Sequence, residues 1–318
     1  MAHLQKQAID ANGSQRVEEL DYLKGIMIVL MISFHLVYIG DSYPYFKQVV
    51  YTFHMPVFLI ISGYLMNIVK PRRQYILTIF RLAVPYVVIE SGYIIAASLF
   101  PIREHINNLT LNVFLIKLFI HPLGPYWYLH TMILCGLAYY VIFHIRCISL
   151  LSRYILIGIA YALFAKAGLL SFHLSLYFLV GIVIRNSTHT FLQIFCPSFL
   201  SFLGAGLLAA NPVNLHTDSV GGVLIIYLVV SGSLACYPYL ANKISRNMVY
   251  LGKNTLSLFL FSPIFTIMCK SFVPIFSFEP TGMLFLLCSL IICILGSLGI
   301  KKTMDECRLS SFFFGPRR

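Results

Sequence analysis

The chain has 318 residues, of which 59% are apolar or aromatic and only 11% are charged. Its mean hydropathy is +0.84. A soluble domain has about 45–50% apolar and about 25% charged residues, so this composition excludes a water-soluble globule. It also excludes intrinsic disorder, which requires low hydrophobicity and high charge. The composition therefore predicts an all-α, polytopic integral membrane protein.

Ten apolar segments divide the chain, and a membrane-crossing helix needs about 20 residues. We expect about ten transmembrane helices, at residues 25–40, 49–69, 82–100, 126–145, 154–170, 173–184, 191–210, 220–240, 254–273 and 281–300. A weaker apolar segment at 112–120 is too short to span and contains Lys117. We expect this segment to be interfacial or re-entrant.

The positions of the basic residues predict the orientation of these helices. In a ten-span arrangement 18 of the 23 Lys and Arg residues fall in the even-numbered loops and the two tails. The odd-numbered loops hold only Lys47, Arg103, Lys117, Lys166 and Lys270. Cytoplasmic segments carry the excess of Lys and Arg, so both termini are predicted to be cytoplasmic.

The predicted organisation is a polar cytoplasmic tail at 1–20, a single ten-helix membrane domain at 21–300 and a basic cytoplasmic tail at 301–318. The net charge is +12, and the basic residues that cause it lie between the predicted spans and not on a soluble face, so we expect no nucleic-acid partner. The eight cysteines show no metal-ligand spacing, and no bound metal is expected. Membrane lipids are the expected surroundings.

Four ionisable side chains lie inside predicted spans, where such groups are costly and by default functional. They are His35, His54, Glu90 and His130, in the first to fourth spans. Counting the helical rise from the span ends places the three histidines at a similar depth, which predicts a polar chamber open to the outer side. The alternative for each histidine is an interhelical hydrogen bond. Glu90 could form an ion pair, orient a histidine or transfer a proton.

Lys24 precedes His35 by eleven residues. Eleven residues return a helix to within about 20° of the starting face and rise about 16 Å. Lys24, Ile28, Met31 and His35 should therefore form one stripe, with Lys24 at the cytoplasmic edge. Histidine is the side chain best suited to act as a base near neutral pH, which makes His35 the candidate general base.

A second group of charges surrounds the start of the third span. Lys70, Arg72, Arg73 and Arg81 lie within twelve residues. Such a group suits a phosphate-rich ligand, because Arg and Lys bind phosphate oxygens. A plain topology signal or an anionic lipid headgroup would explain the same residues.

Two blocks of this sequence resemble the membrane acyltransferase family 3, in particular its fucose 4-O-acetylase-like branch. The first is LDYLKGI at 20–26, closed by His35, and the second is FHMPVFLIISGYL at 53–65. RLAVPY at 81–86 and PYWYL at 125–129 are similar to later blocks of the family. The detailed resemblance covers roughly the first 130 residues. The family's basic-x10-His pair corresponds to Lys24 and His35, with Lys in place of the usual Arg.

The resemblance implies a membrane O-acyltransferase, most often an O-acetyltransferase of the bacterial inner membrane. Its co-substrate would be acetyl-CoA or another acyl-CoA, and its acceptor a sugar hydroxyl of a surface polysaccharide or lipid-linked glycan. We expect His35 as general base or transient acyl carrier, supported by Lys24, His54 and Glu90. His54 would orient His35 or donate to the developing oxyanion. The remaining candidates are Lys70, Arg72, Arg73 and Arg81 for the CoA phosphates, and Trp127 and His130 for the acceptor.

Two other classes of protein share these features. A transporter or flippase for a sugar or lipid-linked oligosaccharide would also have a polar chamber, although the sequence shows no internal repeat and no paired broken helices. A silent partner that anchors glycan-assembly machinery is the other alternative, and the intact His35 and His54 argue against it. A second copy of the chain is a further candidate partner.

Overall fold

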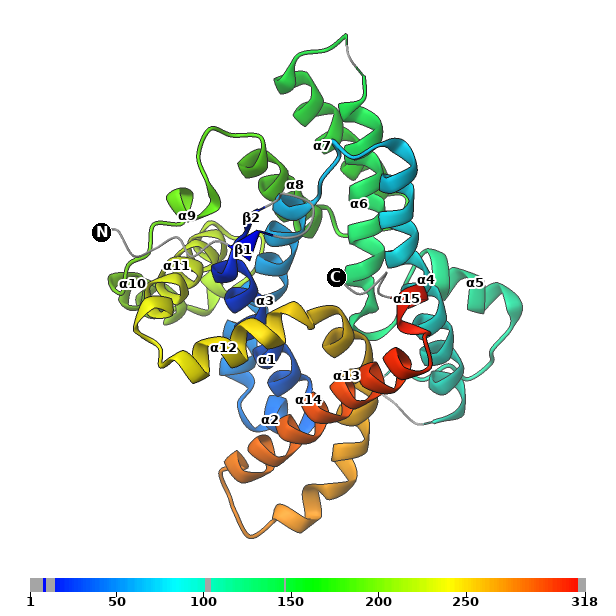
Figure 1. The fold of residues 1–318 in the computed structure, drawn as a ribbon. Coiled ribbons are helices and arrows are strands. Elements are labelled where there is room, and N and C mark those ends of the chain that lie inside the picture. The colour runs from blue at the N-terminus through cyan, green and yellow to red at the C-terminus, as the bar shows by residue number, and fades with distance from the viewer. Residues whose placement is uncertain (1–7, 10–14, 101–103, 146, 314–318) are drawn as a thin grey trace. The chain divides into compact units, whose positions relative to one another are not determined.

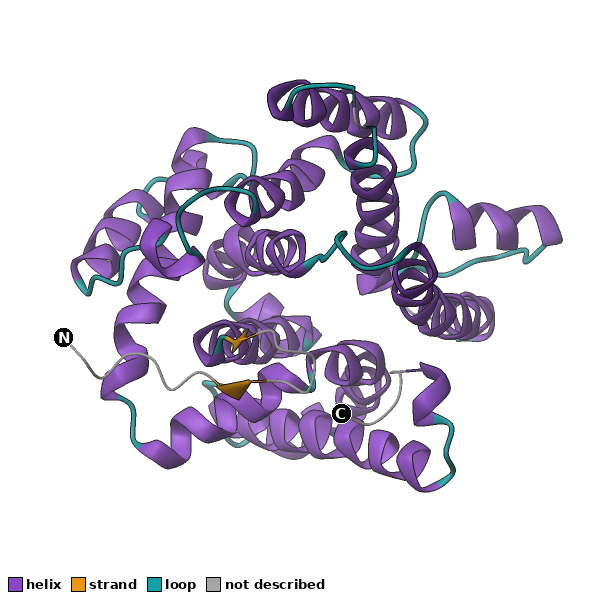
Figure 2. Cartoon of the chain, turned by 45° about the horizontal axis from the view of Figure 1, so that its top comes forward, coloured by secondary structure: helices purple, strands orange, loops and turns teal. Residues whose placement is uncertain are grey.

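The computed structural model describes residues 8–9, 15–100, 104–145 and 147–313. Helices make up nearly all of this part of the chain (Figure 2). Two short antiparallel strands precede them, β1 (Ala8–Ile9) and β2 (Gln15–Arg16). The predicted helical class is therefore confirmed. Most of the predicted tail at 1–20, the end of the basic tail at 314–318, and Arg103 and Arg146 lie outside the described residues.

The α-helices of the described ranges follow one another without further strands. They are α1 (Glu18–His35), α2 (Val37–Ser42), α3 (Pro44–Leu65), α4 (Arg72–Leu99), α5 (Leu111–Phe119), α6 (Trp127–Phe143), α7 (Leu150–Lys166), α8 (Phe172–Arg185), α9 (Phe191–Ile194), α10 (Leu200–Ala209), α11 (Val220–Cys236), α12 (Asn242–Lys253), α13 (Thr255–Cys269), α14 (Met283–Glu306) and α15 (Ser310–Phe313). Short 3-10 turns are η1 (Gly124–Tyr126), η2 (Pro212–Leu215), η3 (Tyr237–Tyr239) and η4 (Lys270–Phe276).

Six helical segments of the described chain are long and apolar enough to cross a membrane. They are Pro44–Leu65, Arg72–Leu99, Gly124–Phe143, Val220–Tyr239, Thr255–Phe276 and Met283–Glu306. These segments make the chain a multi-pass membrane protein. The count of ten spans and the cytoplasmic location of both termini stay predictions.

The bounds predicted for the first span are wrong. α1 begins at Glu18 and ends at His35, where 25–40 was expected, and the chain is extended at Leu36 before α2. The helix starts in the charged segment because Glu18, Glu19 and Asp21 occupy its first turn. Carboxylates there interact favourably with the positive end of the helix dipole.

Two later segments also differ from the prediction. The apolar segment 191–210 is not one helix, since α9 ends at Ile194 and α10 begins at Leu200. Pro197 lies between them, and proline has no N–H for the helical ladder. The segment after the eighth span was expected as a loop, and it forms α12.

The chain divides into two compact units. The first runs to Phe58 and resumes from Leu192 to Cys307, and the second contains Leu59–Phe191 and continues from Arg308. In the first unit α1 packs on α12, α13 on α14, and α10 on α11 (Figure 1). In the second unit α4 packs on α6, and α7 packs on α6 and α8. The predicted single ten-helix domain at 21–300 stays a prediction.

Glycines bring the α1 and α12 backbones into direct contact. A Cβ atom on Gly252 would overlap the carbonyl oxygen of Asp21, and one on Gly25 would overlap the carbonyl oxygen of Met248. Small residues of this kind allow helices in a membrane protein to approach closely. The close approach holds the first turns of α1, which carry Asp21 and Lys24, firmly against α12.

Candidate active site

His35 and His54 lie next to each other in the first unit. Their ring centroids are 6.4 Å apart and the rings meet at 74°, edge to face. His35 ends α1 and is half-buried, whereas His54 lies within α3 and is only 2% exposed. The structure therefore brings together two of the residues that sequence analysis selected, and leaves His35 as the more accessible ring.

Hydrogen bonds to the backbone determine which nitrogen of each neutral ring carries the proton. The Nδ1 atom of His35 lies 2.7 Å from the carbonyl oxygen of Met31, and Nδ1 of His54 lies 2.8 Å from that of Val50. A carbonyl oxygen only accepts, so each Nδ1 carries the proton. The Nε2 lone pair of each neutral ring is consequently the proton-accepting atom. Nε2 of His54 is buried and has no hydrogen-bond partner in the described structure.

Tyr51 connects the histidine pair to a charged pair. Its ring centroid lies 5.7 Å from that of His35 and 5.1 Å from that of His54. The ammonium group of Lys47 lies 5.9 Å from the centre of the Tyr51 ring and 3.8 Å from a carboxylate oxygen of Asp41. A cation over an aromatic face is attracted by the ring quadrupole, so Lys47 helps to hold Tyr51 against the histidines.

A cavity of about 510 Å³ is lined in part by the residues that directly follow His35 in the chain. Leu36 and the α2 residues Tyr38, Asp41 and Ser42 line one part of it. The other part comes from the end of α13, from η4 and from α14, and it includes Thr266, Lys270 and Phe285. Aromatic rings together with hydroxyl, carboxylate and ammonium groups are the lining expected of a site for a polar organic ligand. These residues were not predicted as part of a site, because their chain segments meet only in the fold.

Lys24 forms an ion pair that the sequence analysis also missed. Its ammonium nitrogen lies 2.7 Å from a carboxylate oxygen of Asp21, one turn earlier on α1. Asp21 is 3% exposed. Between Lys24 and His35, Ile28 and Met31 of the predicted stripe are both buried. The i, i+3 spacing of Asp21 and Lys24 was a readable signal for this pair.

Glu90 and His130 lie in the second unit, where Glu90 contacts the segment between α5 and η1 and His130 contacts the end of α5. The backbone N–H of Leu123 donates to Oε1 of Glu90 at 2.6 Å. Nε2 of His130 lies 3.0 Å from the carbonyl oxygen of Phe119, an arrangement in which the ring donates. These bonds favour an anchoring role for both side chains. The predicted catalytic role of Glu90, the substrate-binding role of His130 and the shared depth of the three histidines stay predictions.

The other predicted binding residues also belong to the second unit. Arg72 and Arg73 are exposed in the first turn of α4, and Arg81 lies further along the same helix, half-buried. Lys70 precedes α4 and is half-buried. Trp127 begins α6, with its ring centroid 6.5 Å from that of Tyr128. Their assignments to acyl-CoA and acceptor stay predictions.

Comparison with known proteins decides the family. The model of the acyltransferase family 3, described as an acyltransferase domain, matches residues 17–302. This chain belongs to the acyltransferase 3 family. Both members of the histidine pair, Lys24 and α12 fall within the matched range. The resemblance found in the first 130 residues is thus confirmed and extends through nearly the whole chain.

Two curated relatives are similar to this acyltransferase 3 chain over a short segment. The nodulation protein NolL of Sinorhizobium fredii is 37% identical over 70 residues, which is 20% of this chain and 19% of the relative. The NolL protein of Mesorhizobium japonicum is 46% identical over 63 residues, which is 17% of each protein. The chain thus covers a fifth or less of the length of these relatives. No solved structure was found to match it.

Proposed function

We propose that this protein is an O-acyltransferase that transfers an acyl group, most often acetyl, from acyl-CoA to a sugar hydroxyl. The acceptor would be a surface polysaccharide or a lipid-linked glycan, and the setting a bacterial inner membrane. Membership of the acyltransferase 3 family and the short similarity to the two nodulation proteins support transfer of an acyl group. The observation that carries the proposal is the His35–His54 pair, with Nδ1 of each ring bonded to its own helix.

The chemistry follows from the proton positions on the rings. Nε2 of His35 takes the proton of the acceptor hydroxyl as the hydroxyl oxygen attacks the thioester carbonyl carbon. The carbon–sulfur bond then breaks, and His35 returns the proton to the sulfur, so that CoA leaves as the thiol. The bond from Nδ1 to Met31 keeps the ring oriented throughout, which matters because a base must stay within hydrogen-bond reach of its proton.

His54 acts on His35 and not on the substrate in this proposal. It is nearly fully buried, and its Nδ1 proton is donated to Val50. Its unpartnered Nε2 is an acceptor in the neutral ring, so the geometry favours the orienting role over donation to an oxyanion. With Tyr51, His54 limits the orientations open to the His35 ring.

The cavity after His35 suits the acceptor. Tyr38 and Phe285 provide aromatic faces, and their ring centroids are 5.3 Å apart, edge to face. Asp41, Ser42 and Thr266 offer hydrogen-bonding groups for sugar hydroxyls. Lys270 provides a cation that would suit the phosphate of a lipid-linked sugar. Oligomer formation and contact with glycan-assembly machinery are the partner interactions that this function would use.

The direct test is acyl transfer by the His35→Ala variant. Purified wild-type protein should transfer acetyl from acetyl-CoA to a glycan acceptor, and His35→Ala should not, at equal protein level in the membrane. Normal transfer by the variant would overturn the assignment of His35.

A further inference from the structure

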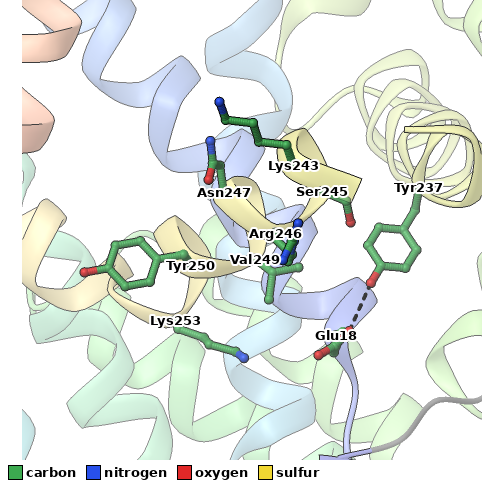
Figure 3. Close-up of a pocket in the computed structure, with 9 residues that line it drawn as sticks. All are labelled: Glu18, Tyr237, Lys243, Ser245, Arg246, Asn247, Val249, Tyr250 and Lys253. Atoms are coloured by element: carbon green, nitrogen blue, oxygen red, sulfur yellow. Dashed lines mark hydrogen bonds between the residues drawn. The ribbon is translucent and has the colours of Figure 1, made fainter. Parts of the chain in front are cut away.

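A second cavity lies at the other end of α1, at the first turn of that helix. It has a volume of about 550 Å³. Glu18 and Tyr237 line one side, and the remaining lining comes from α12 (Figure 3). The lining residues of α12 are Lys243, Ser245, Arg246, Asn247, Val249, Tyr250 and Lys253. Glu18 and His35 are the first and last residues of α1, so the cavity is about 25 Å from His35 along the helix axis.

The cations of this cavity form one stripe on α12. Lys243, Arg246, Tyr250 and Lys253 follow one another at intervals of three, four and three residues, which places them on one helix face. All four are exposed. Arg246 donates from Nε to the carbonyl oxygen of Asn242, the first residue of its own helix, at 3.1 Å.

In the described part of the chain, no ion pair balances the positive charge of the stripe. Across the residues that the structure describes, none of Lys243, Arg246 and Lys253 has a carboxylate within 4.0 Å. Glu18 is the carboxylate of the cavity lining, and it accepts a hydrogen bond from the Tyr237 hydroxyl at 3.3 Å (Figure 3). With three cations and one carboxylate, the lining has an excess of positive charge, which attracts anions.

The opposite face of α12 is already covered. Met248 and Gly252 lie against α1, with the backbones in contact at Gly25 and Asp21. An amphipathic helix that lies on a membrane buries its apolar face in lipid. Val249 and Leu251 of α12 are buried, and Ile244 is its exposed aliphatic side chain, so most of the apolar surface of the helix is covered by protein. The basic stripe is therefore better placed to receive a ligand than to serve as a lipid-bound helix.

We propose that this cavity binds phosphate groups, and that its ligand is the nucleotide end of acyl-CoA; this identification rests on the proposed function. Lys243, Arg246 and Lys253 contact the phosphates, because ammonium and guanidinium groups donate several charge-assisted hydrogen bonds to phosphate oxygens. The exposed ring of Tyr250 offers a face for the adenine base. An anionic lipid headgroup has the same phosphate chemistry and is the other source.

The site differs from the one expected at Lys70, Arg72, Arg73 and Arg81. Those residues belong to the second unit, whereas this cavity belongs wholly to the first. It lies at the opposite end of α1 from the proton-accepting ring, so a nucleotide held here leaves the acyl end free to extend towards His35. Lys243, Arg246 and Lys253 were expected in a loop, and their common helix face was not predicted.

The test is binding of adenosine 3′,5′-bisphosphate to the full-length protein in a neutral detergent. The variant Lys243→Gln/Arg246→Gln/Lys253→Gln should bind at least about tenfold more weakly than wild type, a loss of about 1.4 kcal/mol. Lys302→Gln removes an exposed cation of α14 outside the cavity and should bind as wild type does. Tyr250→Ala should weaken binding of the bisphosphate but not of inorganic phosphate. All variants change exposed side chains, so equal thermal unfolding temperatures should verify their folding.

A parallel titration with short-chain phosphatidylglycerol separates the two sources of phosphate. Binding of this lipid, lost in the triple variant, together with no binding of the bisphosphate would overturn the nucleotide as ligand. Equal affinity of the triple variant and wild type for the bisphosphate would overturn the site. If the bisphosphate fails to bind while wild type transfers acetyl, only this site is wrong. If it binds as expected while wild type transfers no acyl group, the proposed function is wrong and the phosphate site stands.

Discussion

The ring of His35 on α1 meets the ring of His54 on α3 edge to face, with 6.4 Å between the centroids. Each ring donates its Nδ1 proton to the carbonyl oxygen four residues earlier in its own helix. The two imidazoles therefore have fixed orientations and both keep Nε2 as an acceptor. Only His35 is accessible enough to contact a substrate, which separates the base from the residue that positions it.

Replacing His54 should slow turnover without weakening substrate binding. We expect His54→Ala to lower kcat by about tenfold to a hundredfold, because small misplacements of a catalytic group cost up to about that factor. The KM values for both substrates should change little, and the pH profile of kcat should move, since the His35 ring loses its neighbour. Steady-state kinetics across pH measure this. His189→Ala, at an exposed loop position, is the control, and a raised KM with unchanged kcat for His54→Ala would exclude a positioning role.

Removing Lys24 should destabilise the protein through Asp21. Lys24→Ala takes the cation away from a carboxylate that is 3% exposed, and a buried charge that loses a partner costs about 1–3 kcal/mol. Thermal unfolding in detergent measures the loss. Asp21→Asn combined with Lys24→Ala should restore much of the stability. If the restored double variant is still inactive, Lys24 has a role in the reaction; if Lys24→Ala unfolds at the wild-type temperature, the ion pair does not stabilise the fold.

The close approach of α1 and α12 predicts a large effect of a single methyl group. Gly252→Ala would place a Cβ atom onto the carbonyl oxygen of Asp21 and force the helices apart, at a cost of about 1–3 kcal/mol. Gly299→Ala in α14 is the matched control, because a Cβ atom there has no neighbour within 4 Å. The control should be neutral or slightly stabilising, since Ala favours helix over Gly. Equal unfolding temperatures for the two variants would contradict the packing.

The basic residues at the start of α4 provide a separate test of acyl-CoA binding. If Arg72 and Arg73 hold the CoA phosphates, as the sequence predicts, Arg72→Ala with Arg73→Ala should raise the KM for acetyl-CoA, because each exposed guanidinium could donate paired hydrogen bonds to a phosphate. If the α12 cavity holds these phosphates, the KM should not change. Lys166→Gln, at the exposed end of α7, should leave the KM for acetyl-CoA unchanged. Kinetics at varied acetyl-CoA concentration make the comparison. A KM equal to that of wild type would assign Arg72 and Arg73 to membrane orientation alone.

Helical rise and hydropathy predicted much of what surrounds the histidines. The predicted second, third and fourth spans overlap α3, α4 and α6, and the expected proximity of His35 and His54 is found. The span positions follow from hydropathy, and the placement of the two histidines follows from the regular rise per residue of a helix. The extended residue Leu36 was not predictable, because no proline or glycine marks the end of α1 there.

The parts that were missed depend on contacts between distant segments. In the sequence Asp21 is one of several charges near the start of α1, and its burial depends on the contact with α12. The cavity next to His35 in the chain is lined by residues from α2, α13, η4 and α14. α12 is short and charged, so hydropathy averaging hides it, although the spacing of Lys243, Arg246, Tyr250 and Lys253 carries a helical period. Searching charged loops for such a period would have found this helix.

The most direct test of the account is acetyl transfer measured with purified wild type, His35→Ala and His189→Ala. Mass analysis of the glycan acceptor after incubation with acetyl-CoA should show O-acetylation by wild type and by His189→Ala. His35→Ala should give no acetylation above the uncatalysed background, while its unfolding temperature stays close to that of wild type. O-acetylation by folded His35→Ala at the wild-type rate would contradict the central claim that His35 is the general base.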